Sequence, residues 1–272
     1  MMAIGRKGMT GAVPAKLAGA AILAGIAFSI PAAAAGSAPP LPTQLLYAGR
    51  SVEFPAAQEQ VFRLAELELL PALKRQKKDW AIVLDVDDTV LGNYEYERRV
   101  SLPGADQSDA SWDEWIKEKA APAIPGAREF LDKARRIAVR RGRPHGRIVY
   151  ITDRTESQEE DTIKNLTAAG LFVPGRDVIL TKRNAGDKKD VRRRCVEMGR
   201  TGNDPRCAAL APMHIVATFG DSFRDHIEMY GAQVYESGRR QLRDCMSAGR
   251  CFIVPNPMYG QWEPEGAKDP YE

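Results

Sequence analysis

Histidine and closely spaced cysteine pairs are scarce in this chain of 272 residues. The three histidines are scattered, and none of the four cysteines stand in a Cys-x-x-Cys spacing. A zinc site built from the usual Cys and His ligands is therefore not expected. No internal repeat is visible either.

Net charge is also nearly absent. Lys and Arg number 39 and Asp and Glu number 36, and the first 35 residues contain Arg6, Lys7 and Lys16 but no acid. The remainder is formally neutral, which argues against a partner such as a nucleic-acid polymer that binds through bulk charge. A hydrophobic content of 44% is ordinary for a globular protein and argues against a disordered chain, a collagen-like repeat or a polytopic membrane protein.

The first 35 residues predict an export signal. The basic start is followed by the apolar run 17–30 and then by the small residues of 31–36, which is the order that signal peptidase reads. That run is shorter than the ~20 residues of a membrane-spanning helix, and an uncleaved anchor is the alternative. No cysteine lies near the cleavage region to carry a lipid. We expect a mature domain, 36–272, in the bacterial periplasm or secreted, without a stable membrane anchor.

Export would bring the four cysteines into an oxidising compartment, where they are expected to pair. Four cysteines allow three connectivities. We favour Cys195–Cys207 and Cys245–Cys251, because each pair closes a short loop that carries glycine and turn-forming residues.

Short apolar runs alternate with helical patterns along the rest of the chain. The expected strands are 80–84, 147–151, 178–180, 214–219 and 251–254, and the expected helices are 56–76 (kinked or ended by Pro71), 126–141, 156–169, 187–200 and 222–230. This alternation predicts an α/β fold, a Rossmann-like parallel sheet flanked by helices. Residues 36–50 are expected to be a linker or extended arm, 93–122 a small inserted cap, and the arginines between Arg135 and Arg147 a solvated face.

Acidic residues follow two of the expected strands, at the sheet edge where ligands bind in open parallel sheets. The first strand ends in Asp85-Val86-Asp87-Asp88-Thr89. Two carboxylates on one side of an extended chain can hold a divalent cation and divide nucleophile and acid/base roles, although an acidic capping loop has the same composition. The fourth strand ends in a Gly-Asp-x-x-x-Asp run from Gly220 to Asp225, which fits a second half of an oxygen-ligand site or a helix cap.

Two further features are weaker when taken alone. Thr152 follows the second strand and could hold a phosphoryl oxygen, but Thr-Asp is equally an ordinary helix cap. Lys188 and Lys189 begin a helix and could reach an anionic ligand or lie on a solvated basic face.

Four features follow one another along the chain: Asp-x-Asp-x-Thr, the hydroxyl at a strand end, the lysine and Gly-Asp-x-x-x-Asp. A chain with this order of motifs resembles the haloacid dehalogenase (HAD) superfamily of phosphotransferases. The similarity is closer to subfamily IIIB, the branch of bacterial acid phosphatases that includes the outer-membrane lipoprotein 5′-nucleotidase/acid phosphatase. It covers about residues 50–263 and is carried by the local stretches 50–53, 91–93, 112–130, 164–170 and, most specifically, 255–263.

The resemblance implies an exported acid phosphatase that hydrolyses small-molecule phosphomonoesters, with 5′-nucleotides as candidate substrates. Asp85 would be the nucleophile that forms an aspartyl-phosphate, and Asp87 would be the general acid and then the general base. Thr152 would bind the transferring phosphoryl group, and Lys189 or Lys188 would neutralise its charge.

The resemblance also implies a cofactor and a leaving-group pocket. Mg²⁺ would be held by Asp85, the Asp87 carbonyl and Asp221, with Asp225 in support. The residues expected to border the leaving group are Trp112, Trp115, Arg154 and Tyr259.

Several positions depart from the pattern of the relatives. Asp153, Ser222 and His226 replace Asn, Asn and Phe, and 195–212 looks like an insertion. None of these changes removes a chemical group, so we expect the phosphatase chemistry to be kept. Together with the missing lipid-bearing cysteine, they bear on substrate preference and anchoring. The alternatives are a non-catalytic exported binding or surface protein on the same fold, and a phosphotransferase that uses alcohol acceptors.

Overall fold

The computed structural model describes residues 40–140, 143–201, 204–208, 210–227 and 237–260. The expected export signal, residues 228–230 of an expected helix and the last residues of the 255–263 stretch lie outside these ranges. Within them, none of the helices has the length and apolar character needed to cross a membrane.

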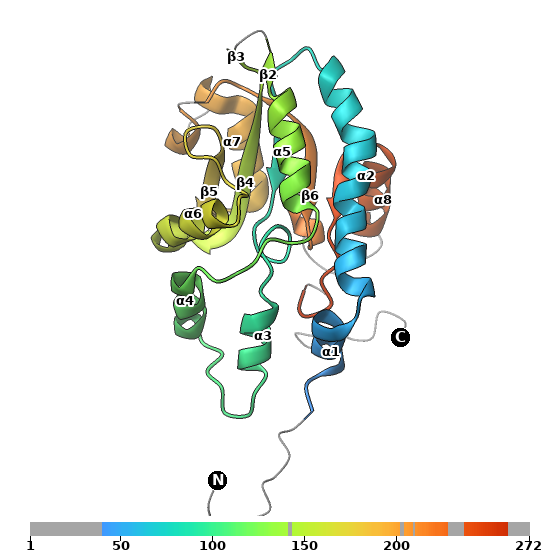
Figure 1. The fold of residues 1–272 in the computed structure, drawn as a ribbon. Coiled ribbons are helices and arrows are strands. Elements are labelled where there is room, and N and C mark those ends of the chain that lie inside the picture. Colours follow the sequence, from blue (N-terminus) through green and yellow to red (C-terminus); the bar gives the residue numbers. More distant parts are fainter. Residues whose placement is uncertain (1–39, 141–142, 202–203, 209, 228–236, 261–272) are drawn as a thin grey trace, which may run out of the picture. The chain divides into compact units, whose positions relative to one another are not determined.

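A five-stranded parallel sheet forms the centre of the described structure (Figure 1). Its order is β5-β4-β1-β6-β7, and each neighbouring pair is parallel. The strands are β1 (Trp80–Leu84), β4 (Gly146–Thr155), β5 (Val178–Lys182), β6 (His214–Gly220) and β7 (Cys251–Ile253). The predicted α/β class and Rossmann-like sheet are confirmed, and β1 has the bounds expected from its apolar run.

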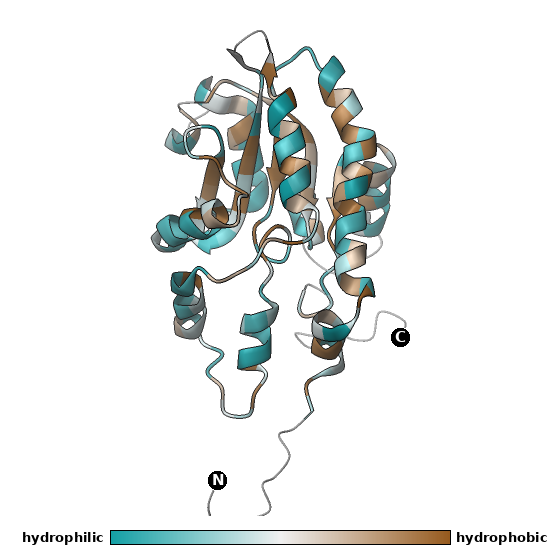
Figure 2. Ribbon diagram, viewed as in Figure 1, coloured by the Kyte–Doolittle hydropathy of each residue, from teal (hydrophilic) through white to brown (hydrophobic). Residues whose placement is uncertain are grey.

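Helices cover both faces of this sheet because alternate strand residues point to opposite sides. From β1, Ile82 and Leu84 join a core cluster with α2 (Glu53–Arg75) and α5 (Ala127–Ile137). On the other face, Ala81 and Val83 join a cluster with α7 (Lys189–Met198). Figure 2 shows hydrophobic residues along the strands and alternating hydrophobic and hydrophilic residues along α2.

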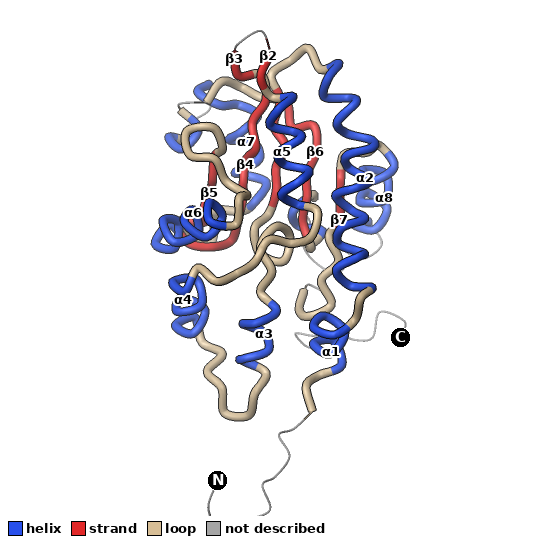
Figure 3. Tube along the Cα trace, viewed as in Figure 1, coloured by secondary structure: helices blue, strands red, loops and turns tan. Residues whose placement is uncertain are grey.

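The remaining elements are short (Figure 3). They are α1 (Thr43–Arg50), α3 (Tyr94–Val100), α4 (Asp109–Glu118), the hairpin of β2 (Val139–Arg140) and β3 (Arg143–Pro144), η1 (Glu156–Gln158), α6 (Glu159–Ala168), η2 (Gly199–Thr201), η3 (Pro205–Cys207), η4 (Phe223–Asp225) and α8 (Arg239–Ser247). The region 93–122 thus contains α3 and α4, which lie beyond the carboxyl ends of the strands (Figure 1).

Two expectations about local structure were wrong. Residues 43–50 form helix α1, with Leu45 buried, and are not a linker. In the described part of 222–230 only the 3₁₀ turn η4 forms.

The helix expected over 56–76 is present as α2, and of the two effects expected of Pro71 it does not end the helix. The helix continues to Arg75 because Leu70 and Leu73 are buried in the core, and this packing offsets the hydrogen bond that proline cannot donate.

Both disulfides favoured from the sequence are present. Cys195–Cys207 joins α7 to η3 across 12 residues, and Cys245–Cys251 joins α8 to β7 across 6 residues. The favoured connectivity is therefore confirmed.

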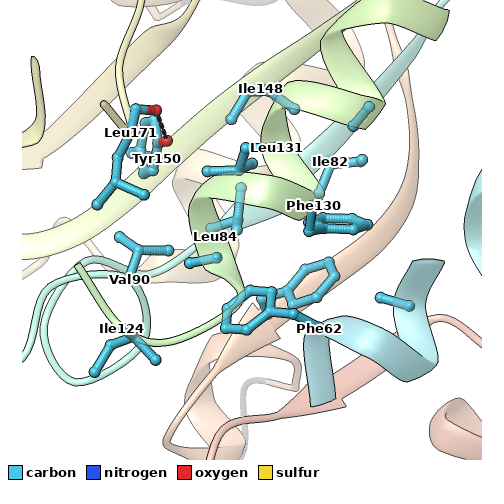
Figure 4. Close-up of a cluster of buried hydrophobic side chains, with 14 of the residues drawn as sticks. Phe62, Ile82, Leu84, Val90, Ile124, Phe130, Leu131, Ile148, Tyr150 and Leu171 are labelled. Carbon is cyan, nitrogen blue, oxygen red and sulfur yellow. Dashed lines mark hydrogen bonds between the residues drawn. The ribbon is translucent and has the colours of Figure 1, made fainter. Parts of the chain in front are cut away.

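The first core cluster is built around aromatic rings and branched aliphatic side chains (Figure 4). Phe62 of α2 stacks on Phe219 of β6 with ring centroids 5.6 Å apart, and Phe130 of α5 lies 5.0 Å from Phe219. These contacts pack α2 and α5 against β6.

The expectation that Arg135 lies on a solvated face was also wrong, because its side chain is buried. Its Nη2 lies 2.7 Å from Oδ2 of Asp177, and the two side chains are 5% and 2% exposed. Asp177 also accepts the backbone N–H of Val173 at 2.8 Å. This ion pair ties α5 to the segment that leads into β5.

Asp177→Ala should lower the free energy of unfolding by about 3–5 kcal/mol, because it leaves the Arg135 cation buried without its carboxylate. The measurement is urea denaturation followed by circular dichroism. Glu114→Ala is the control: it removes the exposed Lys117–Glu114 pair and should cost less than about 1 kcal/mol. Equal losses in the two variants would contradict the assignment.

Candidate active site

The candidate site lies where the chain changes direction across the sheet. After β1 the chain builds β4 and β5 on one side, and it then returns to build β6 and β7 on the other. Crevices at such points are the usual ligand sites of open parallel sheets. Asp85 follows β1 and Asp221 follows β6, and the Asp85 backbone N–H donates to the Phe219 carbonyl at 3.0 Å.

A cavity of about 440 Å³ opens at this edge and brings together residues from distant parts of the chain. The predicted site residues that line it are Asp85, Asp87, Trp112, Arg154, Lys189, Asp221, Asp225 and Tyr259. The cavity therefore joins the acidic motifs to α7, to the 93–122 region and to the segment after β7.

Three carboxylates form a cluster in this cavity. Ligand oxygens of Asp85, Asp221 and Asp225 lie within 4.8 Å of one another. Burial, with Asp225 close by, raises the pKa of Asp221 to about 7, and burial raises the pKa of Asp85 well above its usual value. Buried carboxylates this close repel each other when ionised, and a bound divalent cation relieves that repulsion. The oxygen-only donor set fits a hard cation.

The Asp225 side chain lies close to the backbone of position 220, which requires a glycine there. A Cβ at Gly220 would lie 2.2 Å from the Asp225 carboxylate. The Asp225 side chain also accepts the Ser222 backbone N–H at 2.9 Å. The Gly-Asp-Ser turn therefore folds Asp225 back toward Asp221.

Lys189 is the cation nearest to these carboxylates. Its Nζ lies 2.7 Å from Asp85 Oδ1 and 2.5 Å from Asp225 Oδ1. Although burial opposes its charged form, the two carboxylates raise the pKa of Lys189 above its usual value. Lys188, the other candidate, is the N-cap residue of α7 and has an exposed side chain.

Asp87 is held by two donors from other segments. Arg154 Nη2 lies 2.7 Å from Asp87 Oδ1, and its Nε is 3.1 Å from each Asp87 oxygen. Asn93 Nδ2 donates to Oδ1 at 3.0 Å. Arg154 thus contacts Asp87, and its guanidinium lies 5.6 Å from the Trp112 ring centroid. Thr152 is fully buried, and its hydroxyl accepts the Arg154 backbone N–H at 3.1 Å.

Asp88 and Asn93 also belong to the site, although they were not among the site residues expected from the sequence. Asp88 is buried and has a φ of 51°. Its carboxylate accepts the Asn93 backbone N–H at 3.0 Å, Asn93 Nδ2 at 3.1 Å and the Tyr259 hydroxyl at 2.5 Å. Burial raises the pKa of Asp88 to about 6. The sequence signal for Asp88 is its carboxylate, which follows those of Asp85 and Asp87 in the first acidic motif.

The aromatic candidates take different positions. Tyr259 is anchored to Asp88, and the Trp112 ring packs on Tyr96 with centroids 4.8 Å apart at 71°. Trp115 is buried, and its Nε1–H donates to Asn93 Oδ1 at 2.9 Å. Trp115 therefore supports Asn93, while Trp112 and Tyr259 face the cavity.

Comparisons with known proteins identify the family of this chain. The family model for the HAD superfamily, subfamily IIIB (acid phosphatase), matches residues 41–262. Two solved structures of the class C acid phosphatase from Bacillus anthracis, one of them with tungstate bound, are similar to this chain, with 28% sequence identity and TM-scores of 0.66 and 0.65. Each match covers 81% of this chain and 85% of the Bacillus anthracis chain. HAD enzymes generally use a divalent metal, for which the Asp85–Asp221–Asp225 cluster offers ligands. This chain therefore belongs to subfamily IIIB of the HAD superfamily and is an acid phosphatase that hydrolyses phosphomonoesters.

Proposed function

We propose that the protein is an exported, Mg²⁺-dependent acid phosphatase that acts through an aspartyl-phosphate and accepts 5′-nucleotides. The observation that carries this proposal is the cluster of Asp85, Asp221 and Asp225 around Lys189 at the carboxyl ends of β1 and β6. It combines a nucleophile, oxygen ligands and a fixed cation in one cavity.

Asp85 attacks the phosphorus of the substrate, and the bond from phosphorus to the leaving oxygen breaks. Lys189 Nζ, 2.7 Å from Asp85 Oδ1, neutralises the negative charge of the transferring group. Asp87 gives a proton to the leaving oxygen and later takes one from the water that hydrolyses the aspartyl-phosphate. The contacts from Arg154 and Asn93 orient the Asp87 carboxylate for both transfers.

Mg²⁺ would be held by the side chains of Asp85, Asp221 and Asp225 and by the Asp87 carbonyl. When bound, the ion neutralises charge on the phosphoryl oxygens. Mg²⁺ suits the site because it prefers carboxylate oxygens and keeps several water ligands.

The cavity walls support a planar leaving group. Trp112 and Tyr259 both line the cavity, and each has its position fixed, Trp112 by Tyr96 and Tyr259 by Asp88. Aromatic rings of this kind stack on nucleobases, which favours nucleotides among the phosphomonoesters.

Export is supported by two independent features. The N-terminal sequence has the charged, apolar and small-residue order of a signal peptide. The chain also carries two disulfides and no free cysteine, which is typical of proteins in oxidising compartments.

Asp85→Asn should lower kcat for p-nitrophenyl phosphate by at least about a thousandfold, because the amide cannot act as the nucleophile. Asp132→Asn, a matched change of a half-exposed carboxylate on α5 that does not line the cavity, should keep wild-type kcat. Steady-state kinetics at saturating Mg²⁺ measures both. Full activity in Asp85→Asn would rule out this nucleophile.

Removal of the metal with EDTA should abolish hydrolysis, and added Mg²⁺ should restore it. Asp221→Asn should raise the Mg²⁺ concentration needed for half-maximal activity by about tenfold or more, because one carboxylate ligand is lost. A titration of activity against Mg²⁺ measures the change. Activity that is unaffected by EDTA would contradict the metal requirement.

Trp112→Ala should raise KM for 5′-AMP by about tenfold, since stacking of a base on an aromatic ring contributes about 1–3 kcal/mol. KM for glycerol 3-phosphate, which has no ring, should change by less than about twofold. If both substrates lose affinity equally, Trp112 does not recognise the leaving group.

A further inference from the structure

A fully buried arginine lies behind the candidate active site, and the mechanism above does not use it. Arg192, on α7, has a side chain with 0% exposure. Its guanidinium donates to the carbonyl of Thr152, to the carbonyl of Leu180 at 3.1 Å, to the carbonyl of Asp187 at 3.1 Å and to Asp153 Oδ1 at 2.8 Å. Arg192 therefore joins the ends of β4 and β5 to the turn that leads into α7.

A second arginine holds the same turn from the outside. Arg206, on η3, binds the Asp187 carboxylate with both terminal nitrogens, at 2.7 and 3.1 Å, and its Nη1 donates to the Thr181 carbonyl at 3.0 Å. Asp187 Oδ2 also accepts the Arg183 backbone N–H at 3.0 Å. A two-point contact of this kind fixes orientation as well as distance.

The segment that carries Arg206 is itself tied to α7. The Cys195–Cys207 disulfide follows Arg206 directly and reaches the middle of α7. Both cysteines are buried in the second core cluster, beside Val196 and Leu210. Residues 204–208 are therefore held to α7 by a covalent bond and to the turn before α7 by the Arg206–Asp187 contact.

We propose that Arg206 is a positioning residue for phosphoryl transfer, which, together with the buried contacts of Arg192, holds the first turn of α7 so that Lys189 reaches Asp85. This inference rests on the catalytic roles proposed for Lys189 and Asp85. Lys189 is the first residue of α7 and lies two positions after Asp187. Movement of the 183–187 turn would displace the lysine from its 2.7 Å contact with Asp85, and a displacement of about 1 Å in an active site can cost about a hundredfold in rate.

The alternative is that these contacts only stabilise the fold, and a double-mutant cycle separates the two roles. The cycle compares Arg206→Ala, Lys189→Ala and the combined variant by kcat for p-nitrophenyl phosphate, each at a temperature well below its own Tm. Residues that act through one another show non-additive effects. If Arg206 acts through Lys189, Arg206→Ala lowers kcat about tenfold in the wild-type background and less than twofold in the Lys189→Ala background.

The matched control is Arg194→Ala, on the same helix. Its side chain is 64% exposed and pairs with Asp190, so kcat should not change. If Arg206→Ala does not fold, Arg206→Lys takes its place in the cycle, because it keeps the charge but not the two-point contact.

An effect of Arg206→Ala that is equally large in the Lys189→Ala background would overturn the inference, as would an unchanged kcat in the single variant. These outcomes leave the proposed function intact, because the wild-type protein still hydrolyses the substrate. An inactive wild-type protein would instead overturn both the proposed function and the inference that rests on it.

Discussion

The parallel pairing of β1 with β4 on one side and β6 on the other is the constraint on which the site depends. Leu84 is opposite both Tyr150 and Phe219 in these pairings, so β1 and β6 end close together, and β4 runs past them on the other side of β1. The residues that follow them then share one edge of the sheet, which brings Asp85 beside Asp221. The helix α7 adds Lys189 at the same edge. The chemistry follows from this register, because no local segment contains all the groups that it needs.

The carboxylates of the site also require positive charge close to them. Asp85, Asp221 and Asp225 would repel one another in a buried cavity without cations. The protein supplies Lys189 to this cluster and Arg154 to Asp87, and the remaining carboxylate charge is what attracts a divalent ion. A chain with no net charge beyond its first 35 residues can therefore still concentrate charge of both signs where a phosphate ester binds.

Much of the fold and of the candidate site could be predicted from the sequence, for a different physical reason in each case. The strands were predictable because a strand buried on both faces is a continuous apolar run, and the acids were located because they directly follow such runs. The disulfides were favoured because their partners are near in sequence. Burial of Arg135 and the roles of Arg154 and Trp115 were not predictable, because their partners are 42, 67 and 22 residues away. The left-handed backbone of Asp88 likewise has no local sequence signal, since aspartate adopts it only in certain contexts.

The hydrogen bond between Tyr259 and Asp88 makes one wall of the cavity depend on the far end of the chain. These two residues are separated by 171 positions, and Tyr259 lies after β7. The cavity is therefore complete only when the segment after β7 has packed against the loop that follows β1. A chain shortened before Tyr259 would lack this part of the pocket wall, although the segments that form the five strands would all be present.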